Sequence, residues 1–206
     1  MPRRASLGRM LRVRPATIHD LPGTYRVCLL TGDAGQDATS LYGDPDLLGH
    51  VYVGAYVVGQ PGTELVVADD DGVAGYLLAA DDTQAFEAWA EAEWWPVLRE
   101  RYPRLDDGGH AGKLVRLIHE PERTPEAVTR DYPAHLHIDL LERARSRGLG
   151  RLLIQGLIDD LRARGIRGVH LGVAAANTNA IGFYGHLGFE VIDEDPGGPL
   201  MGLRLD

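Results

Sequence analysis

The stretch from Ala134 to Arg164 constrains the fold of this chain most strongly, because it predicts a strand, a tight turn and a helix in direct succession. Residues 134–140 read AHLHIDL, in which His and Asp alternate with Leu and Ile at the two-residue period of a strand. Residues 149–161 carry Leu and Ile at steps of three and four, the apolar stripe of an amphipathic helix. Gly165 follows the basic end of that helix as a stop signal. The stretch therefore predicts a strand–turn–helix unit of an α/β protein.

The turn inside this unit, Arg145–Gly150 (RSRGLG), has the chemistry of an anion-binding site. The first turn of a helix leaves several backbone N–H groups without partners, and the helix dipole adds partial positive charge there. Gly148 and Gly150 carry no Cβ, so a phosphate group can approach the backbone closely. The turn lacks both the third glycine of a dinucleotide fingerprint and the Lys-Ser/Thr pair of a P-loop. Taken alone, it is also compatible with an ordinary strand-to-helix connection.

A second block, residues 177–189 (NTNAIGFYGHLGF), follows downstream. Together with the R-x-x-G-x-G pattern of Arg145–Gly150, it resembles the GNAT N-acetyltransferase superfamily, in which the first motif binds the pyrophosphate of acetyl-CoA. The two blocks lie in the family's order and at about its usual distance, within roughly the last third of the chain. The resemblance implies an α/β (α+β) GNAT fold with a mixed central sheet of about six to seven strands flanked by helices. It also implies acetyl-CoA (CoA) as the cofactor.

Three other segments carry a narrower resemblance. Residues 32–46 (GDAGQDATSLYGDPD), 94–96 (WWP) and 132–141 (YPAHLHIDLL) are similar to bacterial GNAT proteins that resemble the acetyltransferase-like C-terminal domain of O-GlcNAcase. That eukaryotic domain is suspected of being a pseudo-acetyltransferase. The resemblance to the GNAT superfamily implies an acyltransferase that moves an acetyl group from acetyl-CoA to a primary amine. The narrower resemblance supports the alternative of an acetyl-CoA-binding pseudo-acetyltransferase with a sensing or scaffolding role. Transfer of a longer acyl group is a further alternative.

The resemblance assigns several residues to the cofactor. Backbone N–H groups near Leu140 and Leu141 would polarise the thioester carbonyl, and the backbone of residues 147–151 would hold the pyrophosphate. The arginine side chains of this turn would lie near the phosphates or remain solvated. The cofactor-binding residues that the resemblance implies are Leu140, Leu141, Arg145, Arg147, Gly148, Leu149, Gly150, Arg151, Asn177, Asn179 and Phe183.

The resemblance also implies a general acid, and the strand pattern supplies candidates for a general base. Tyr184 would protonate the departing CoA thiolate, because a phenol with a pKa near 10 keeps its proton at neutral pH. A core tyrosine on a helix is the alternative. His135, His137 and Asp139 share one face of the predicted strand, so Asp139 or His137 could accept the ammonium proton, directly or through water. A buried structural His–Asp pair would give the same pattern.

The acceptor is expected to contact a long loop near the N-terminus. Residues 31–46 are rich in Gly and Asp, and long ordered loops in compact domains are often functional. In GNAT-like proteins this segment walls the acceptor pocket, whether the acceptor amine belongs to a small molecule or to a protein. The acidic and turn-forming residues of the loop are equally typical of helix caps and turns. The candidate acceptor contacts are Asp33, Tyr42, Asp44 and His135.

Patterns elsewhere predict one domain over residues 10–206, preceded by a flexible N-terminal arm over residues 1–9. A hairpin signal, Asp69–Gly72, separates two of the predicted strands. Asn179 is expected to cap the last helix, and Asn177 would contact the pantetheine arm of the cofactor or cap that helix. The other predicted strands cover residues 10–14, 64–68, 73–80, 168–174, 189–192 and 200–205, and the other predicted helices cover residues 21–30, 47–58 and 180–187.

About fifty residues, at about 83–133, form a helical insertion between the third and fourth core strands. Its first apolar face predicts a helix that Pro96 kinks or restarts. Residues 114–119 are predicted as a short strand or extended segment, and residues 124–130 as a short helix with Pro125 at its first position. The tandem Trp94-Trp95 favours core packing, with a pocket wall or a dimer contact as alternatives.

Composition limits the partners and the cellular context. A net charge of −9 argues against a general nucleic-acid binder, whose surface would be basic, and gives weak support to a cationic acceptor. The single cysteine, Cys28, excludes an intramolecular disulfide and fits a reducing cytoplasm. No apolar run is long enough to span a membrane, and no set of His, Cys and carboxylate residues has zinc-site spacing. We therefore expect a cytoplasmic protein with no metal and no nucleic-acid or membrane partner, and a homodimer stays open.

Overall fold

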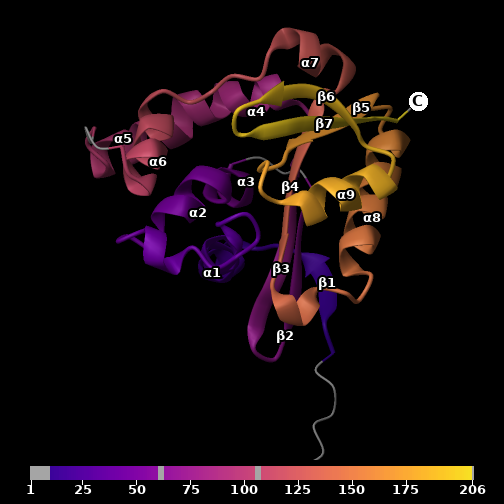
Figure 1. Cartoon of the computed structure of the whole chain (residues 1–206), viewed down its shortest axis with the longest axis horizontal. Coiled ribbons are helices and arrows are strands. Elements are labelled where there is room, and N and C mark those ends of the chain that lie inside the picture. The colour runs from indigo at the N-terminus through magenta and orange to yellow at the C-terminus, as the bar shows by residue number, and fades with distance from the viewer. Residues whose placement is uncertain (1–9, 60–62, 105–107, 206) are drawn as a thin grey trace, which may run out of the picture.

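The computed structural model describes residues 10–59, 63–104 and 108–205, so the arm expected over residues 1–9 lies outside the described part. Among the described residues one sheet contains β1 (Arg12–Pro15), β2 (Thr63–Asp69), β3 (Gly72–Ala80), β4 (Ala134–Leu140), β5 (Gly168–Gly172), β6 (Glu190–Asp195) and β7 (Gly198–Arg204). Their order in the sheet is β1-β2-β3-β4-β5-β7-β6 (Figure 1). Neighbouring strands are antiparallel except β4 and β5, which are parallel. This mixed seven-stranded sheet confirms the predicted fold class.

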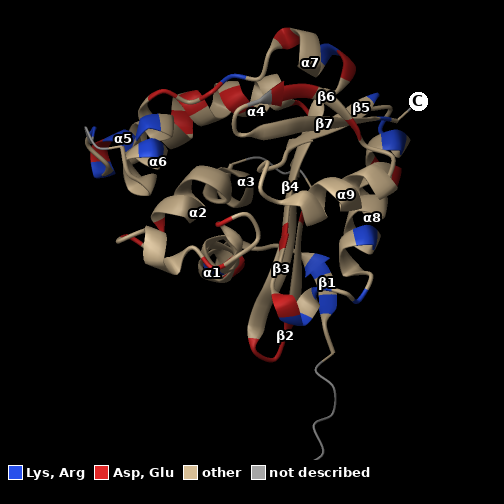
Figure 2. Ribbon diagram, viewed as in Figure 1, with Lys and Arg blue, Asp and Glu red and all other residues tan. Residues whose placement is uncertain are grey.

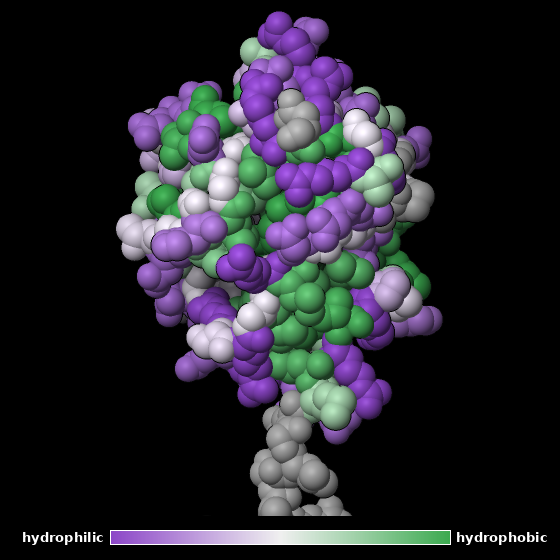
Figure 3. Space-filling view, turned by 90° about the vertical axis from the view of Figure 1, so that its right-hand side faces the viewer, coloured by the Kyte–Doolittle hydropathy of each residue, from purple (hydrophilic) through white to green (hydrophobic). Residues whose placement is uncertain are grey.

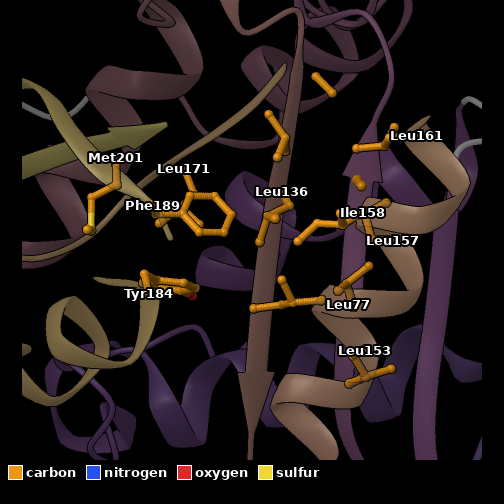
Figure 4. Close-up of a cluster of buried hydrophobic side chains, with 14 of the residues drawn as sticks. Leu77, Leu136, Leu153, Leu157, Ile158, Leu161, Leu171, Tyr184, Phe189 and Met201 are labelled. Carbon is orange, nitrogen blue, oxygen red and sulfur yellow. The ribbon is translucent and has the colours of Figure 1, made fainter. Parts of the chain in front are cut away.

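Helices cover both faces of the sheet (Figure 1). On one face lie α1 (Leu21–Thr31), α2 (Leu47–Tyr52) and α3 (Gly54–Val58), and on the other lie α8 (Leu149–Ala163) and α9 (Thr178–His186). Because neighbouring residues of a strand face opposite sides, Leu77 packs into the cluster of α8, whereas Tyr76 packs into the cluster of α1 to α3 (Figure 4). The shorter helical segments outside the insertion are η1 (Ile18–Asp20), η2 (Thr39–Leu41) and η4 (Glu142–Ala144).

The helix predicted over residues 47–58 is two helices, because the chain breaks at Val53, whose φ is −127°. The break brings the backbone of Gly54 against two aromatic rings. A Cβ at Gly54 would lie within 2.6 Å of the Tyr25 hydroxyl and the Trp94 ring. Glycine at this position therefore allows α3 to pack closely on α1 and on the insertion.

The first half of the insertion is one nearly continuous helical rod. It consists of α4 (Thr83–Trp89), the π-helical segment η3 (Ala90–Trp94) and α5 (Trp95–Arg101). Pro96 lies in the first turn of α5, where a missing N–H costs no hydrogen bond, so the helix restarts there as predicted. The Trp94 Nε1–H donates to the carbonyl of His50 at 3.0 Å, and both tryptophans pack against the core around α1 to α3.

The second half of the insertion corrects the prediction of a strand or extended segment over residues 114–119. These residues belong to α6 (His110–His119). The apolar residues Leu114, Val115 and Ile118 recur at helical spacing and are buried, and they outweigh the strand preference of the β-branched side chains. The predicted helix at 124–130 is α7 (Glu126–Asp131), with Pro125 just before its first residue.

Leu157→Ala is expected to lower the free energy of unfolding by about 2–5 kcal/mol, because it opens a cavity in the main core. Leu157 is fully buried on the face of α8 that packs against the sheet (Figure 4). Leu152 on the same helix is 60% exposed, so Leu152→Ala is the matched control and should change the free energy by less than about 0.5 kcal/mol. Urea denaturation of both variants measures the difference. Equal losses would show that α8 does not pack with this face inward.

Charge and apolar surface are unevenly distributed. The chain has a net charge of −9. Basic residues nevertheless gather on β1 and near the beginning of α8, and acidic residues lie along α4 (Figure 2). The side of the molecule that carries α8 shows an apolar area bordered by hydrophilic residues (Figure 3).

The homodimer that the sequence leaves open stays a prediction. Within the described ranges, no helix has the length and apolar character needed to cross a bilayer.

Candidate active site

The parallel strands β4 and β5 separate near the centre of the sheet. Within the described residues the two strands pair at only two positions, Ala134 with Val169 and His135 with His170. The Leu141 N–H donates to the Ala74 carbonyl of β3 at 2.8 Å. Because alternate residues of a strand point their backbone groups to opposite neighbours, the N–H groups of Ile138 and Leu140 face away from β3, into the opening. Leu141, expected to polarise a carbonyl, instead uses its N–H within the sheet.

A cavity of about 440 Å³, here called the turn cavity, lies beside this opening. It brings the two sequence motifs together, although they are about thirty residues apart. Arg147 and Leu141 are not among its lining residues. The predicted site residues that line it are Asp139, Leu140, Arg145, Gly148, Leu149, Gly150, Arg151, Asn177, Asn179, Phe183 and Tyr184.

The glycine turn brings the N-terminus of α8 to the turn cavity. Gly148 has a φ of +73° and directly precedes Leu149, the first residue of α8. Only glycine adopts this left-handed conformation without cost, and a Cβ there would meet no protein atom within 4 Å. Gly150 is limited by packing instead, since its Cβ would lie 3.3 Å from the Phe183 ring. The first backbone N–H groups of α8 therefore point into open space, as an anion site requires.

Arg145 links two segments that line the turn cavity. Its Nε–H donates to the Leu140 carbonyl at 2.7 Å, and its Nη2–H donates to the Gly35 carbonyl at 2.8 Å. The guanidinium thus connects the end of β4 with the loop after α1. Gly35 and Gln36 consequently line the cavity, although no sequence signal marks them for it.

Asn177, not Asn179, caps α9. The Asn177 side chain accepts a hydrogen bond from the Ala180 N–H at 3.2 Å, so the helix begins two residues earlier than expected. Both residues can meet the spacing of a cap, and the chain direction after β5 selects the first. Asn179 lines the turn cavity without a side-chain bond among the described residues. Asn179 is therefore the asparagine that remains available for a ligand.

Tyr184 reaches from α9 toward β4 (Figure 4). The residue is only 8% exposed and packs against Phe189, with ring centroids 5.7 Å apart. Its hydroxyl has no hydrogen-bond partner within the described part of the chain, and the residue lines the turn cavity. Burial, together with the charge of Asp139, raises the pKa of Tyr184 above its usual value. The phenol therefore keeps its proton across the neutral range.

Asp139 is held by a tyrosine from the neighbouring strand. Tyr76 on β3 lies opposite Asp139 in the sheet, and its hydroxyl donates to Asp139 Oδ2 at 2.5 Å. Burial raises the pKa of Asp139 to about 6, although the hydrogen bond from Tyr76 and the charge of Arg145 lower it. A carboxylate with this pKa is mostly deprotonated at neutral pH and can accept a proton. Tyr76 carries no motif, and only the strand register identifies it.

A second cavity of about 320 Å³, here called the insertion cavity, lies against the preceding residues of β4. Its lining includes His135, Leu136 and His137, whereas Ile138 and the next two residues line the turn cavity. The two cavities therefore meet β4 at successive residues beside the strand opening. The other walls of the insertion cavity come from the helices between α2 and α5, residues 121–124, β5 and β7.

His135 and His137 differ in their partners. The Tyr56 hydroxyl lies 2.5 Å from His135 Nε2, and Thr83 Oγ1 lies 2.8 Å from Nδ1. Thr83 donates its own proton to the Pro133 carbonyl, so His135 donates from Nδ1 and accepts at Nε2 as a neutral ring. His137 has no hydrogen bond among the described residues, and burial lowers its pKa to about 4. His135 is therefore structural, whereas His137 is available to a ligand.

The three loop residues proposed as acceptor contacts do not line either cavity. Asp33 is exposed and pairs through its backbone with Gln36. The Tyr42 ring meets the His110 ring edge-on, with centroids 6.2 Å apart. Asp44 accepts a hydrogen bond from the Tyr102 hydroxyl at 2.7 Å. In this structure Asp44 and Tyr42 join the loop to the insertion.

Metal-ligand geometry is not seen at either cavity. Across residues 10–59, 63–104 and 108–205, no three His, Cys, Asp or Glu side chains are grouped so that they could hold a metal ion.

Sequence comparisons identify one matching family and several relatives. The family model described as the acetyltransferase (GNAT) family matches residues 36–189. Protein O-GlcNAcase of Rattus norvegicus is 26% identical over 184 residues, which cover 87% of this chain and 20% of that protein. The chain thus spans about a fifth of that relative's length. The ribosomal protein bS18-alanine N-acetyltransferase of Salmonella typhimurium is 51% identical over 104 residues, covering 49% of this chain and 64% of that protein.

Solved structures with a similar fold include two of particular interest. The crystal structure of SsHAT matches with a TM-score of 0.87 at 36% identity, covering 95% of this chain and 98% of that chain. The Salmonella typhimurium protein yncA, solved with its cofactor acetyl-CoA, matches with a TM-score of 0.53 at 19% identity, covering 96% of this chain and 95% of that chain, a likeness of fold. The chain belongs to the GNAT family of acetyltransferases.

Proposed function

We propose that this chain transfers an acetyl group from acetyl-CoA to a primary amine. The observation that carries the proposal is the meeting of two cavities at one strand opening, with an anion-binding helix terminus on one side and proton-handling groups between them. The distant fold relative yncA has acetyl-CoA as its cofactor, which supports the same cofactor here. When bound, acetyl-CoA supplies the acetyl group as an activated thioester.

The residues of the turn cavity fit the phosphates of such a cofactor. The backbone N–H groups from Gly148 to Arg151 would bind the pyrophosphate, since the left-handed Gly148 leaves their side open. Asn179 and Phe183 would contact the part of the cofactor that passes along α9. Arg145 would act as a brace for the cavity, because two of its five N–H donors bind backbone carbonyls on opposite sides of it.

The backbone of β4 would polarise the reacting carbonyl. The N–H groups of Ile138 and Leu140 face the strand opening, where a carbonyl oxygen can accept from them. Such fixed donors stabilise developing negative charge without reorganisation, and removing one costs about 10²- to 10³-fold in turnover in well-studied enzymes. Ile138 thus takes the place that the sequence alone assigns to Leu141.

Asp139 and Tyr184 would exchange protons with the reactants. Asp139 Oδ would accept one proton of the ammonium group, directly or through water. The neutral amine nitrogen would then form the C–N bond as the C–S bond of the thioester breaks, Tyr184 Oη would give its proton to the departing sulfur, and the second proton lost by the nitrogen would restore the phenol. The pKa values favour Asp139 over His137 as the base, because about 6 is nearer neutrality than about 4. His137 would instead contact the incoming amine from the insertion cavity.

The rate is expected to depend on the ionisation of Asp139. Below a pH of about 6 the carboxylate is protonated and cannot accept a proton, so kcat/KM should fall tenfold per pH unit on the acidic side. Tyr76→Phe removes a hydrogen bond that lowers the pKa of Asp139, so the acidic limb should move to higher pH. Asp139→Asn should abolish the limb together with most of the rate. An unchanged acidic limb in Asp139→Asn would assign the base elsewhere.

Release of CoA thiol in the presence of amines tests the proposed reaction. We expect thiol release from acetyl-CoA that depends on both the enzyme and an amine, with the acetylated amine detected by mass spectrometry. The alternative, an acetyl-CoA-binding pseudo-acetyltransferase, draws support from the similarity to O-GlcNAcase. Tight acetyl-CoA binding without thiol release on any amine of a broad panel would select that alternative.

A further inference from the structure

The insertion cavity is not needed to bind the cofactor, yet it opens beside the same strand gap. Its walls come from the helices between α2 and α5, residues 121–124 and the strands β4, β5 and β7, so it is bounded on several sides. A volume of about 320 Å³ is roughly twice that of an engineered cavity that holds benzene. This size fits a small molecule.

Most polar groups around the insertion cavity are already paired with one another. His135 is bonded at both ring nitrogens, as described above. His170 Nδ1 donates to the Tyr132 carbonyl at 2.8 Å, and Glu87 accepts from the Thr124 N–H at 3.0 Å. Arg123 lies 3.8 Å from Glu87 and is also shared with Glu91. These groups have little capacity left for a ligand.

Two titratable side chains of the lining have no bonded partner among the described residues, and the Thr124 hydroxyl is also open to a ligand. His137 and Glu122 have no hydrogen bond or ion pair among the described residues. The Tyr52 ring lies 6.2 Å from the His137 ring, and His137 and Glu122 both line the insertion cavity. The available titratable groups are thus one neutral imidazole at the strand opening and one exposed carboxylate on the same cavity.

The rest of the lining is apolar, with side chains such as Val51, Phe86, Trp95 and Leu136. A ligand that fits must present one amine and an apolar body. An amino sugar or a polyamine would lose several hydrogen bonds to water without replacement, at about 1–3 kcal/mol for each unpaired group. A carboxylate on the ligand would face Glu122 and Glu87.

We propose that the acetyl acceptor is a small primary monoamine with a compact apolar body, which binds in the insertion cavity with its amine between Glu122 and His137. This inference rests on the proposed acetyl transfer for its meaning, but the binding itself can be measured without turnover. Glu122 attracts the ammonium group to the mouth of the pocket, and the aromatic and aliphatic walls hold the body.

Calorimetric titration of the CoA-saturated protein with phenethylamine tests the inference, with glucosamine, spermidine and a lysine-containing peptide as comparison ligands. We expect phenethylamine to bind at least about tenfold more tightly than the others, a difference of about 1.4 kcal/mol. Stronger binding of glucosamine, spermidine or the peptide would overturn the proposed acceptor class.

Two variants locate the binding in the insertion cavity. Gly172 is on the face of β5 shared by His170, and a Cβ there would meet no atom within 4 Å, so Gly172→Val narrows the pocket without a clash. It should weaken phenethylamine binding at least about tenfold, or 1.4 kcal/mol, and leave acetyl-CoA affinity unchanged. Glu122→Gln should weaken it about twofold to fivefold, whereas the exposed Glu126→Gln on α7 serves as the unchanged control. Unaltered binding in Gly172→Val would place the amine elsewhere.

The failure of this inference differs from the failure of the proposed function. Thiol release with spermidine or the lysine peptide, and none with phenethylamine, would overturn the acceptor class and keep the acetyl transfer. Tight, Gly172-sensitive phenethylamine binding without thiol release would support the pocket and contradict the acetyl transfer.

Discussion

Gly148→Asp is expected to raise the Kd for acetyl-CoA at least about 100-fold, which corresponds to about 2.7 kcal/mol. The variant places a carboxylate at the N-terminus of α8, where the backbone N–H groups would otherwise bind the pyrophosphate. The fold should survive, because a Cβ at this position meets no atom within 4 Å and Asp is among the few residues other than glycine that visit a left-handed φ. The loss of affinity therefore comes from charge repulsion and from occupation of the anion site.

Gly148→Asn is the matched control for charge, since Asn has nearly the same shape as Asp and also tolerates a left-handed φ. It should weaken acetyl-CoA binding less than Gly148→Asp does, and the difference between the variants should shrink as salt is added. Calorimetry at two ionic strengths measures both effects. If Gly148→Asp keeps wild-type affinity, the pyrophosphate binds at another place.

Tyr184→Phe is expected to lower turnover at least about tenfold, within the range of about 10²- to 10⁴-fold that general acids commonly contribute. Only the hydroxyl is removed, and that hydroxyl has no partner among the described residues, so the packing against Phe189 should persist. Acetyl-CoA affinity should change less than about twofold, because the phenol acts on the leaving sulfur and not on the bound ground state.

Steady-state thiol release, combined with calorimetry for affinity, separates these two effects of Tyr184→Phe. Tyr132→Phe is a suitable control, since Tyr132 is half-buried and lies outside the turn cavity. It should keep wild-type turnover. Equal turnover in Tyr184→Phe and wild type would remove Tyr184 as the acid and assign it to the core alone.

The parts of the site that depend on local sequence could be predicted. The glycine turn and α8 follow from neighbouring residues, because a strand, a left-handed glycine and an amphipathic helix each have short-range signals. The motif at 177–189 likewise predicts a helix that brings Tyr184 to the same place, and the structure confirms that the two motifs share one cavity. The chemical roles within that cavity stay predictions.

The parts that depend on pairing between distant segments could not be predicted. Tyr76 and Asp139 are 63 residues apart, and only the register of β3 against β4 places the phenol on the carboxylate. Two further contacts also join segments that are distant in the sequence. The Leu141 N–H donates to β3, and the Arg145 guanidinium donates to the Gly35 carbonyl. Sequence periodicity states which face a residue takes but not which partner it meets there.

The insertion shows a different cause of error. In α6 the β-branched Val115 and Ile118 favour a strand by local preference, yet the spacing of the buried residues is that of a helix. Packing against α2 and α5 decides between the two. The same packing forms the insertion cavity, which no motif in the sequence marks.

The central claim, that the turn cavity binds the cofactor of an acetyltransferase, is tested most directly by calorimetric titration of the protein with acetyl-CoA and with CoA. We predict one site with a Kd of about 1–100 µM for each ligand, and an affinity that weakens as salt is added. The absence of binding for both ligands would contradict the claim and leave the glycine turn a structural connection between β4 and α8.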